Sequence, residues 1–89
     1  MNTYNLYIGS NNDTHELELN TIEKITGSLF QGFSLSQTTG YWNGKKEQTA
    51  IVTIATDESA LVTRLATILK EVLKQEAVMI NQIGMAQFI

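Results

Sequence analysis

Tyr41 and Trp42, together with Lys45 and Lys46, form the group of side chains in this sequence best suited to bind a ligand. The two aromatic residues precede an Asn-Gly pair, and the two lysines follow it. Aromatic rings stack on nucleobases, and ammonium groups attract anions. The segment is therefore a candidate site for a small anionic or nucleotide-like ligand. A structural alternative stays open, in which the rings pack across a β-hairpin and the lysines keep its tip in water.

A second polar segment, Gly9-Ser10-Asn11-Asn12, precedes an expected helix. Backbone N–H groups and short polar side chains in such a position can bind an anion. The segment lacks the glycine spacing and the lysine of a P-loop. We therefore add Asn11 and Asn12 to the candidate ligand-binding residues, with a plain Asn-rich turn as the alternative.

The residues needed for most catalytic and metal chemistries are missing. The chain has no cysteine, and its one histidine, His15, is flanked by acidic residues, an arrangement more typical of a solvated loop than of a metal site. No second histidine and no serine elbow motif accompany it. We predict no catalytic residue, no metal site and no cofactor. An enzyme remains a lesser alternative, which would need a dry pocket that shifts the pKa of a Tyr, Glu or Lys.

The composition predicts a single domain over residues 1–89. The formal net charge is -3 and charged residues make up 17% of the chain, whereas proteins that bind duplex nucleic acid cluster Lys and Arg against phosphates. The first residues carry no basic segment, and no apolar run approaches the roughly 20 residues that cross a bilayer. We expect a soluble cytoplasmic protein with neither duplex nucleic acid nor a membrane as partner.

Three strands are predicted from alternating apolar residues, over residues 3–8, 33–42 and 48–55. Asn43-Gly44 separates the last two. Asn-Gly is the preferred pair of a type I′ hairpin turn, because both central residues of that turn need positive φ. The last two strands are therefore expected to form a β-hairpin.

Two helices are predicted from apolar residues at helical spacing. The first begins at Asn20, where Glu23 would complete a capping box, and ends near Gly32. The second begins after Thr56, whose hydroxyl would cap it, with two acidic residues in its first turn. Its apolar stripe is predicted to consist of Leu61, Leu65, Ile68 and Val72, widened by Val62, Ala66, Leu69 and Leu73.

The order strand, helix, strand, strand, helix, strand predicts an α+β protein, a ferredoxin-like βαββαβ two-layer sandwich with a four-stranded antiparallel sheet. Residues 77–80 supply the last strand, and residues 83–89 either extend it past a kink at Gly84 or form a short extra C-terminal strand. In this topology the loop over residues 9–14, the hairpin tip and the Lys74-Gln75-Glu76 turn lie at the same end of the sheet.

One face of such a sheet has no helices over it. Tyr7, Ile51 and Thr53 would lie on that face and make it partly apolar. We therefore predict a homo-oligomer that associates through these three residues. The same face would carry Thr49 and either Phe33 or Leu35.

Short motifs give the chain a wider resemblance. Leu6-Tyr7-Ile8-Gly9, Gly40-Tyr41-Trp42 and Gln75-Glu76-Ala77-Val78 are similar to segments of a bacterial family of uncharacterised domains, and the chain resembles the ferredoxin-like group of small regulatory and binding proteins. Members of that group that resemble nitrogen-regulatory signalling proteins bind nucleotides in clefts between subunits. The resemblance implies a nucleotide-binding oligomer, although this chain lacks their long flexible loop.

Three hypotheses about function follow. The first is a non-catalytic oligomer that binds a small anionic or nucleotide-like ligand near the hairpin tip, where Trp42 stacks on it, lysines meet its charge and asparagines supply hydrogen bonds. The alternative is a protein-interaction module, such as a small phage-type inhibitor or sequestering protein, that uses the hairpin and the acidic surface against a basic partner. The third is a cofactor-free enzyme that works on the concave face of the sheet.

Overall fold

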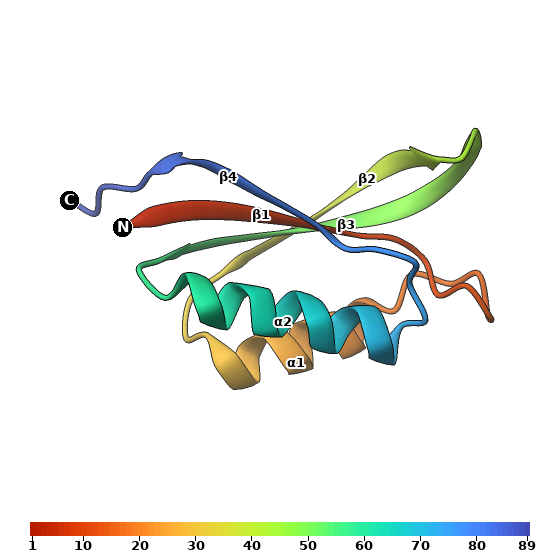
Figure 1. Ribbon diagram of the computed structural model, residues 1–89, viewed down its shortest axis with the longest axis horizontal. Coiled ribbons are helices and arrows are strands. Elements are labelled where there is room, and N and C mark those ends of the chain that lie inside the picture. Colours follow the sequence, from red (N-terminus) through yellow and green to blue (C-terminus); the bar gives the residue numbers. More distant parts are fainter.

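Four strands and two helices follow one another in the order βαββαβ in the computed structural model, which describes residues 1–89. The sheet is antiparallel with the order β2-β3-β1-β4, and both helices cover one of its faces (Figure 1). The ferredoxin-like βαββαβ fold predicted from the sequence is confirmed. The elements are β1 (Asn2–Ile8), α1 (Leu19–Leu29), β2 (Ser34–Trp42), β3 (Lys45–Thr56), α2 (Ser59–Val72) and β4 (Met79–Met85).

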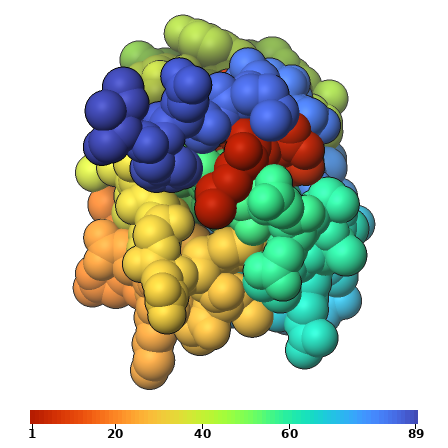
Figure 2. Space-filling model, turned by 90° about the vertical axis from the view of Figure 1, so that its left-hand side faces the viewer, coloured from red at the N-terminus to blue at the C-terminus, as the bar shows by residue number.

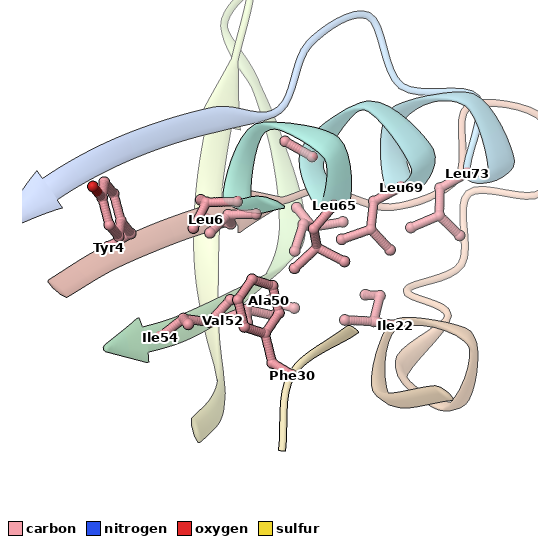
Figure 3. Packing of buried hydrophobic residues seen from close by; sticks show 13 residues of the cluster. Tyr4, Leu6, Ile22, Phe30, Ala50, Val52, Ile54, Leu65, Leu69 and Leu73 are labelled. Carbon is pink, nitrogen blue, oxygen red and sulfur yellow. The ribbon is translucent and has the colours of Figure 1, made fainter. Parts of the chain in front are cut away.

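The hydrophobic core lies between the sheet and the two helices (Figure 3). Alternate residues of the two central strands point into it, as period-2 patterning requires. Each large aliphatic side chain that leaves water there stabilises the fold by roughly 1.5–3 kcal/mol. The strands contribute Tyr4, Leu6, Ile8, Ala50, Val52 and Ile54, and the helical layer contributes Ile22, Phe30, Val62, Leu65, Ala66, Leu69 and Leu73.

The buried face of α2 differs from the predicted stripe. Leu65 is buried, but Leu61 and Ile68 are half-buried and Val72 is 47% exposed. The residues expected only to widen the stripe form its centre together with Leu65. The helix was predicted correctly and the direction of its buried side was wrong, because two adjoining apolar stripes left the packing against the sheet to decide the rotation.

The predicted helix caps are wrong, although the first helix starts within one residue of the prediction. α1 begins at Leu19 without a side-chain cap, so Asn20 and Glu23 form no capping box. Glu18, the residue before the helix, instead accepts a hydrogen bond from the amide of Asn11 at 2.7 Å, a contact within the β1–α1 loop. Thr56 accepts the N–H of Glu58 at 3.1 Å, which shapes the turn before α2 and does not cap the helix itself.

The hairpin turn has the predicted type. Asn43 and Gly44 have φ of 52 and 76, the left-handed values that a type I′ turn requires. β3 begins directly after the turn, at Lys45, so the paired region is longer than predicted. Tyr41 lies opposite Lys46, and Trp42 lies opposite Lys45. The hairpin therefore extends beyond the helical layer (Figure 1).

β4 pairs with β1 over residues 79–85 and continues through a register shift opposite Thr3 and Tyr4. Gly84, with φ of 137, lies at this irregularity, where its backbone conformation is rare for other residues. Residues 83–85 thus extend the strand, and residues 86–89 form no extra one. The strand begins at Met79, two residues later than predicted.

The other face of the sheet is uncovered. Tyr7, Ile51 and Thr53 are half-buried there, and Tyr7 lies directly opposite Ile51. Phe33 and Leu35, one of which was expected on this face, both pack against the core instead, since Leu35 pairs with the inward-facing Val52. Neither helix has the length and apolar character that crossing a bilayer requires.

The two ends of the chain lie together, far from the hairpin tip. The backbone N–H of Ala86 donates to the carbonyl of Met1 at 2.7 Å. Figure 2 views the molecule from this side, with the N-terminal and C-terminal residues next to each other above the helices. A tag on either end would therefore lie away from the end of the sheet described next.

Candidate functional site

Three segments distant in sequence meet at one end of the sheet: the hairpin tip, the β1–α1 loop and the α2–β4 turn (Figure 1). Trp42 Nε1 donates to the Glu76 carboxylate at 2.9 Å and joins the hairpin to the turn. Ser10 Oγ donates to the carbonyl of Gln48 at 3.1 Å, and the Gln75 amide donates to the carbonyl of Ser10. These bonds connect all three segments, which the predicted topology places at the same end.

A hollow of about 510 Å³ opens here on the uncovered face of the sheet. Tyr7 and Trp42 supply aromatic surface to its lining, Met79 supplies apolar surface from the start of β4, and Tyr41 also belongs to the lining. This volume lies within the range of small-molecule sites, which are lined mainly by apolar and aromatic groups with a few polar ones. The polar groups of the lining include Asn12, Glu47, Thr49, Gln75 and Glu76.

Two glycines create part of this space. A Cβ atom on Gly9 would lie 2.9 Å from Gln75 Oε1 and even closer to Glu47 Oε1. A Cβ atom on Gly40 would collide with Thr49 Oγ1. Because both glycines line the hollow, their missing side chains let the neighbouring polar groups approach the backbone closely.

A second hollow of about 520 Å³ adjoins the first and is mostly polar. Asn11, His15, Lys45 and Lys46 belong to its lining. Four residues line both hollows, so the two spaces adjoin and share one wall. The shared residues are Asn12, Trp42, Glu47 and Glu76.

The structure brings all six candidate ligand-binding residues into these two hollows. Tyr41 lines the first, whereas Asn11, Lys45 and Lys46 line the second; Asn12 and Trp42 line both. Tyr41 and Trp42 are adjacent in a strand, so their side chains leave the backbone toward opposite faces. Their exposed fractions are 72% and 53%. Trp42 is therefore the better placed of the two rings for stacking within the site.

Asn11 is occupied within its own loop. Its amide donates to Glu18, and its side-chain oxygen accepts the backbone N–H of Asp13 at 2.8 Å and of Thr14 at 3.2 Å. The side chain thus shapes the β1–α1 loop in the manner of an Asx turn. Asn12 is exposed next to it and has a free amide to offer a ligand.

Sequence reasoning missed several residues of the first hollow. Glu47 and Glu76 were not named as ligand-binding residues, although the turn that contains Glu76 was expected at this end, and Tyr7 was assigned only to an oligomer interface. The place of Tyr7 and Glu47 in this lining depends on strand register, which puts Glu47 opposite Gly40 on the uncovered face. No three His, Cys, Asp or Glu side chains are grouped in a way that could hold a metal ion.

Known structures share the fold. No protein family and no curated protein matches the chain, so the resemblance to a bacterial family of uncharacterised domains finds no support. A phage SAM lyase in its apo state superposes with a TM-score of 0.76 at 20% identity, over 98% of this chain and 84% of that one. CutA1 from Oryza sativa gives 0.56 at 12% identity, over 100% and 84%. CutA1 from Pyrococcus horikoshii OT3 gives 0.54 at 14%, over 97% and 86%. At sequence identities this low, the superpositions establish a common fold and nothing further.

Proposed function

We propose that the protein binds a small nucleotide-like ligand in the two adjoining hollows, and that adenosine derivatives such as S-adenosylmethionine (SAM) are the class to test first. The observation that carries the proposal is the half-exposed Trp42 ring on the wall shared by an aromatic hollow and a lysine-lined one. The fold likeness to a phage SAM lyase over 98% of this chain supports the choice of class.

Each side chain of the proposed site would contact a particular part of such a ligand. Trp42 stacks on the base, an interaction worth about 1–3 kcal/mol per base. Asn12 reaches both hollows and offers donors and an acceptor to ring nitrogens or ribose hydroxyls. Lys45 and Lys46 attract the negative group of the ligand in the second hollow. The structural role of the hairpin is compatible with this use, because the Asn43-Gly44 turn fixes where these side chains lie.

The test follows the fluorescence of Trp42, the only tryptophan of the chain, during titration with adenosine, ATP and SAM. We expect at least one of them to change the emission and to raise the melting temperature, since a ligand at 100 times its Kd stabilises the native state by about 2.7 kcal/mol. Trp42→Ala should weaken binding about tenfold or more by the melting assay, whereas Phe88→Ala, at the opposite end, should not. No response to any of the three ligands would refute the proposal.

A second candidate function is catalysis on the bound ligand. Tyr7 and Glu47 are both half-buried in the first hollow, which gives an acid–base pair of residue types the sequence alone did not place together. Incubation with SAM and separation of the nucleosides by chromatography distinguishes the two functions. Conversion that is lost in Tyr7→Phe or Glu47→Gln would establish an enzyme. Stable binding without conversion would leave a non-catalytic binding protein.

Self-association of this cytoplasmic protein through the uncovered face is part of the same proposal. Tyr7 and Ile51 lie opposite each other there, and Thr53 donates to Asn5 Oδ1 at 2.7 Å beside them. The face therefore combines apolar groups with a polar pair already satisfied within one chain, which lowers the cost of covering it.

A further inference from the structure

We infer that the aromatic hollow selects a positively charged ligand group, so that the ligand is a cationic nucleoside such as a sulfonium compound and its neutral thioether analogue binds more weakly. This inference rests on the proposed function and specifies the charge of the ligand. It departs from the expectation of an anionic ligand, which the lysines of the hairpin suggested.

The first hollow has negative charge and no positive charge in its lining. Glu47 and Glu76 line it, whereas Lys45 and Lys46 line only the second hollow. The half-buried setting of Glu47 strengthens the attraction between its carboxylate and a cation, because the effective dielectric constant there is lower than in water.

Both carboxylates are positioned by contacts within the protein. Glu47 packs its carboxyl group over Gly9, whose missing side chain leaves room for it; a Cβ there would lie 2.9 Å from Glu47 Cδ. Glu76 accepts the hydrogen bond of the Trp42 indole, which keeps its carboxylate beside the ring. The indole N–H points outward in the plane of the ring, so this carboxylate lies at the ring edge, where its own charge attracts a cation.

Thr49 is an independent sign that the hollow is built for a ligand. Its side chain is only 7% exposed and lines the hollow, yet its hydroxyl makes no hydrogen bond within the protein. The Oγ1 atom lies against Gly40 in the same lining. The hydroxyl is therefore free to pair with a polar group of a ligand in the hollow, such as a ribose hydroxyl.

The two hollows together define the order of groups on the ligand. The base stacks at Trp42, the cation lies in the first hollow between the carboxylates, and a carboxylate group at the far end reaches the lysines of the second. A nucleoside triphosphate fits this pattern poorly, because its phosphates would meet Glu47 and Glu76 on the shared wall.

The experiment compares SAM with S-adenosylhomocysteine, a matched pair that differs by the methyl group and its positive charge. Isothermal titration of the full chain at low salt should give SAM a Kd smaller by about tenfold or more. In Glu47→Gln the ratio of the two Kd values should fall toward one, and in Glu76→Gln it should fall in part. Glu71→Gln is the matched control, since Glu71 is exposed on α2 outside both hollows.

The outcomes separate this inference from the proposed function. Equal affinity for both compounds would refute the charge selection and leave nucleoside binding intact. Binding of neither compound would refute this inference, and it would refute the proposed function as well if adenosine and ATP also fail to bind. If Glu47→Gln fails to fold, the test is the ratio of the two Kd values in the wild-type chain. Added salt should bring this ratio closer to one, because salt screens the attraction between the carboxylates and the sulfonium charge.

Discussion

The indole nitrogen of Trp42 donates a hydrogen bond to the carboxylate of Glu76 at 2.9 Å, although the two residues lie 34 positions apart in the chain. The bond joins the hairpin tip to the α2–β4 turn on the wall shared by both hollows. Because it is exposed to solvent, its net contribution to stability is small. Its main effect is to orient the ring.

Removing the acceptor tests this role. Glu76→Ala should let the Trp42 ring move, which raises acrylamide quenching and lowers its fluorescence anisotropy. The free energy of unfolding should change by less than about 1 kcal/mol. Glu71→Ala, an exposed carboxylate on α2, serves as the control and should leave both fluorescence measurements unchanged. Unaltered quenching in Glu76→Ala would mean that the ring is held by other contacts.

Gly40→Ala should destabilise the protein. The new Cβ would collide with the hydroxyl of Thr49, a buried β-branched side chain with little freedom to rotate away. Overpacking of this kind costs about 1–3 kcal/mol, measured by urea denaturation. Gly32→Ala has no atom within 4 Å of its new Cβ and is the matched control. A Gly40→Ala variant as stable as Gly32→Ala would show that Thr49 can shift without cost.

Thr26→Val should stabilise the protein. The Thr26 side chain is fully buried in α1, and its hydroxyl has no hydrogen-bond partner. Replacing this hydroxyl by a methyl group of similar size removes an unsatisfied polar atom, a gain of about 1 kcal/mol or more in unfolding free energy. Thr63→Val on α2 is the comparison, because that hydroxyl is exposed and donates to the Ser59 carbonyl. A loss of stability in Thr26→Val would indicate a partner for the hydroxyl.

The buried side of α2 can be tested with two truncations on one helix. Leu69→Ala should cost about 2–5 kcal/mol, because Leu69 is fully buried in the core. Val72→Ala should cost less than about 1 kcal/mol, since that side chain is 47% exposed. Equal losses in thermal or chemical denaturation would instead favour the stripe predicted from the sequence, or a partner that covers Val72.

Ile51→Glu should weaken self-association by placing a charge at the centre of the uncovered face. Sedimentation velocity at several concentrations would then show a shift toward the monomer. Gln37→Glu adds the same charge to β2, and its position opposite the inward-facing Ala50 puts it on the other side of the sheet. This control should keep the wild-type distribution. A wild-type chain that is monomeric at all concentrations would refute the proposed interface.

The fold could be predicted because its main determinants are local. Asn43-Gly44 sets the hairpin through backbone conformation, and the alternation in β1 and β3 sets which residues face the core. Features that depend on individual side-chain contacts could not be predicted in the same way. Glu18, the residue before α1, accepts the hydrogen bond from Asn11. The rotation of α2 about its axis depends on how the helix packs against the sheet.

The candidate site likewise contains residues that the sequence predicted and residues that it did not. Strand order alone predicted that Trp42, Lys45 and Asn12 would lie at one end of the sheet, and the structure places them there. Glu47 could not be assigned, because the predicted strand began one residue later and its facing depends on register. The turn that contains Glu76 was expected at this end of the sheet, but the hydrogen bond from Trp42 to Glu76 is specified by no pattern in the sequence.

None of the thirteen core residues lines either hollow. Substitutions at Glu47, Glu76 or Lys46 can therefore change what the hollows recognise with little loss of folding free energy, whereas most functional changes in proteins must first overcome such a loss. Descendants of one sequence could diverge quickly in ligand preference while the βαββαβ frame stays constant. Such divergence would leave proteins alike in shape and poorly matched in sequence.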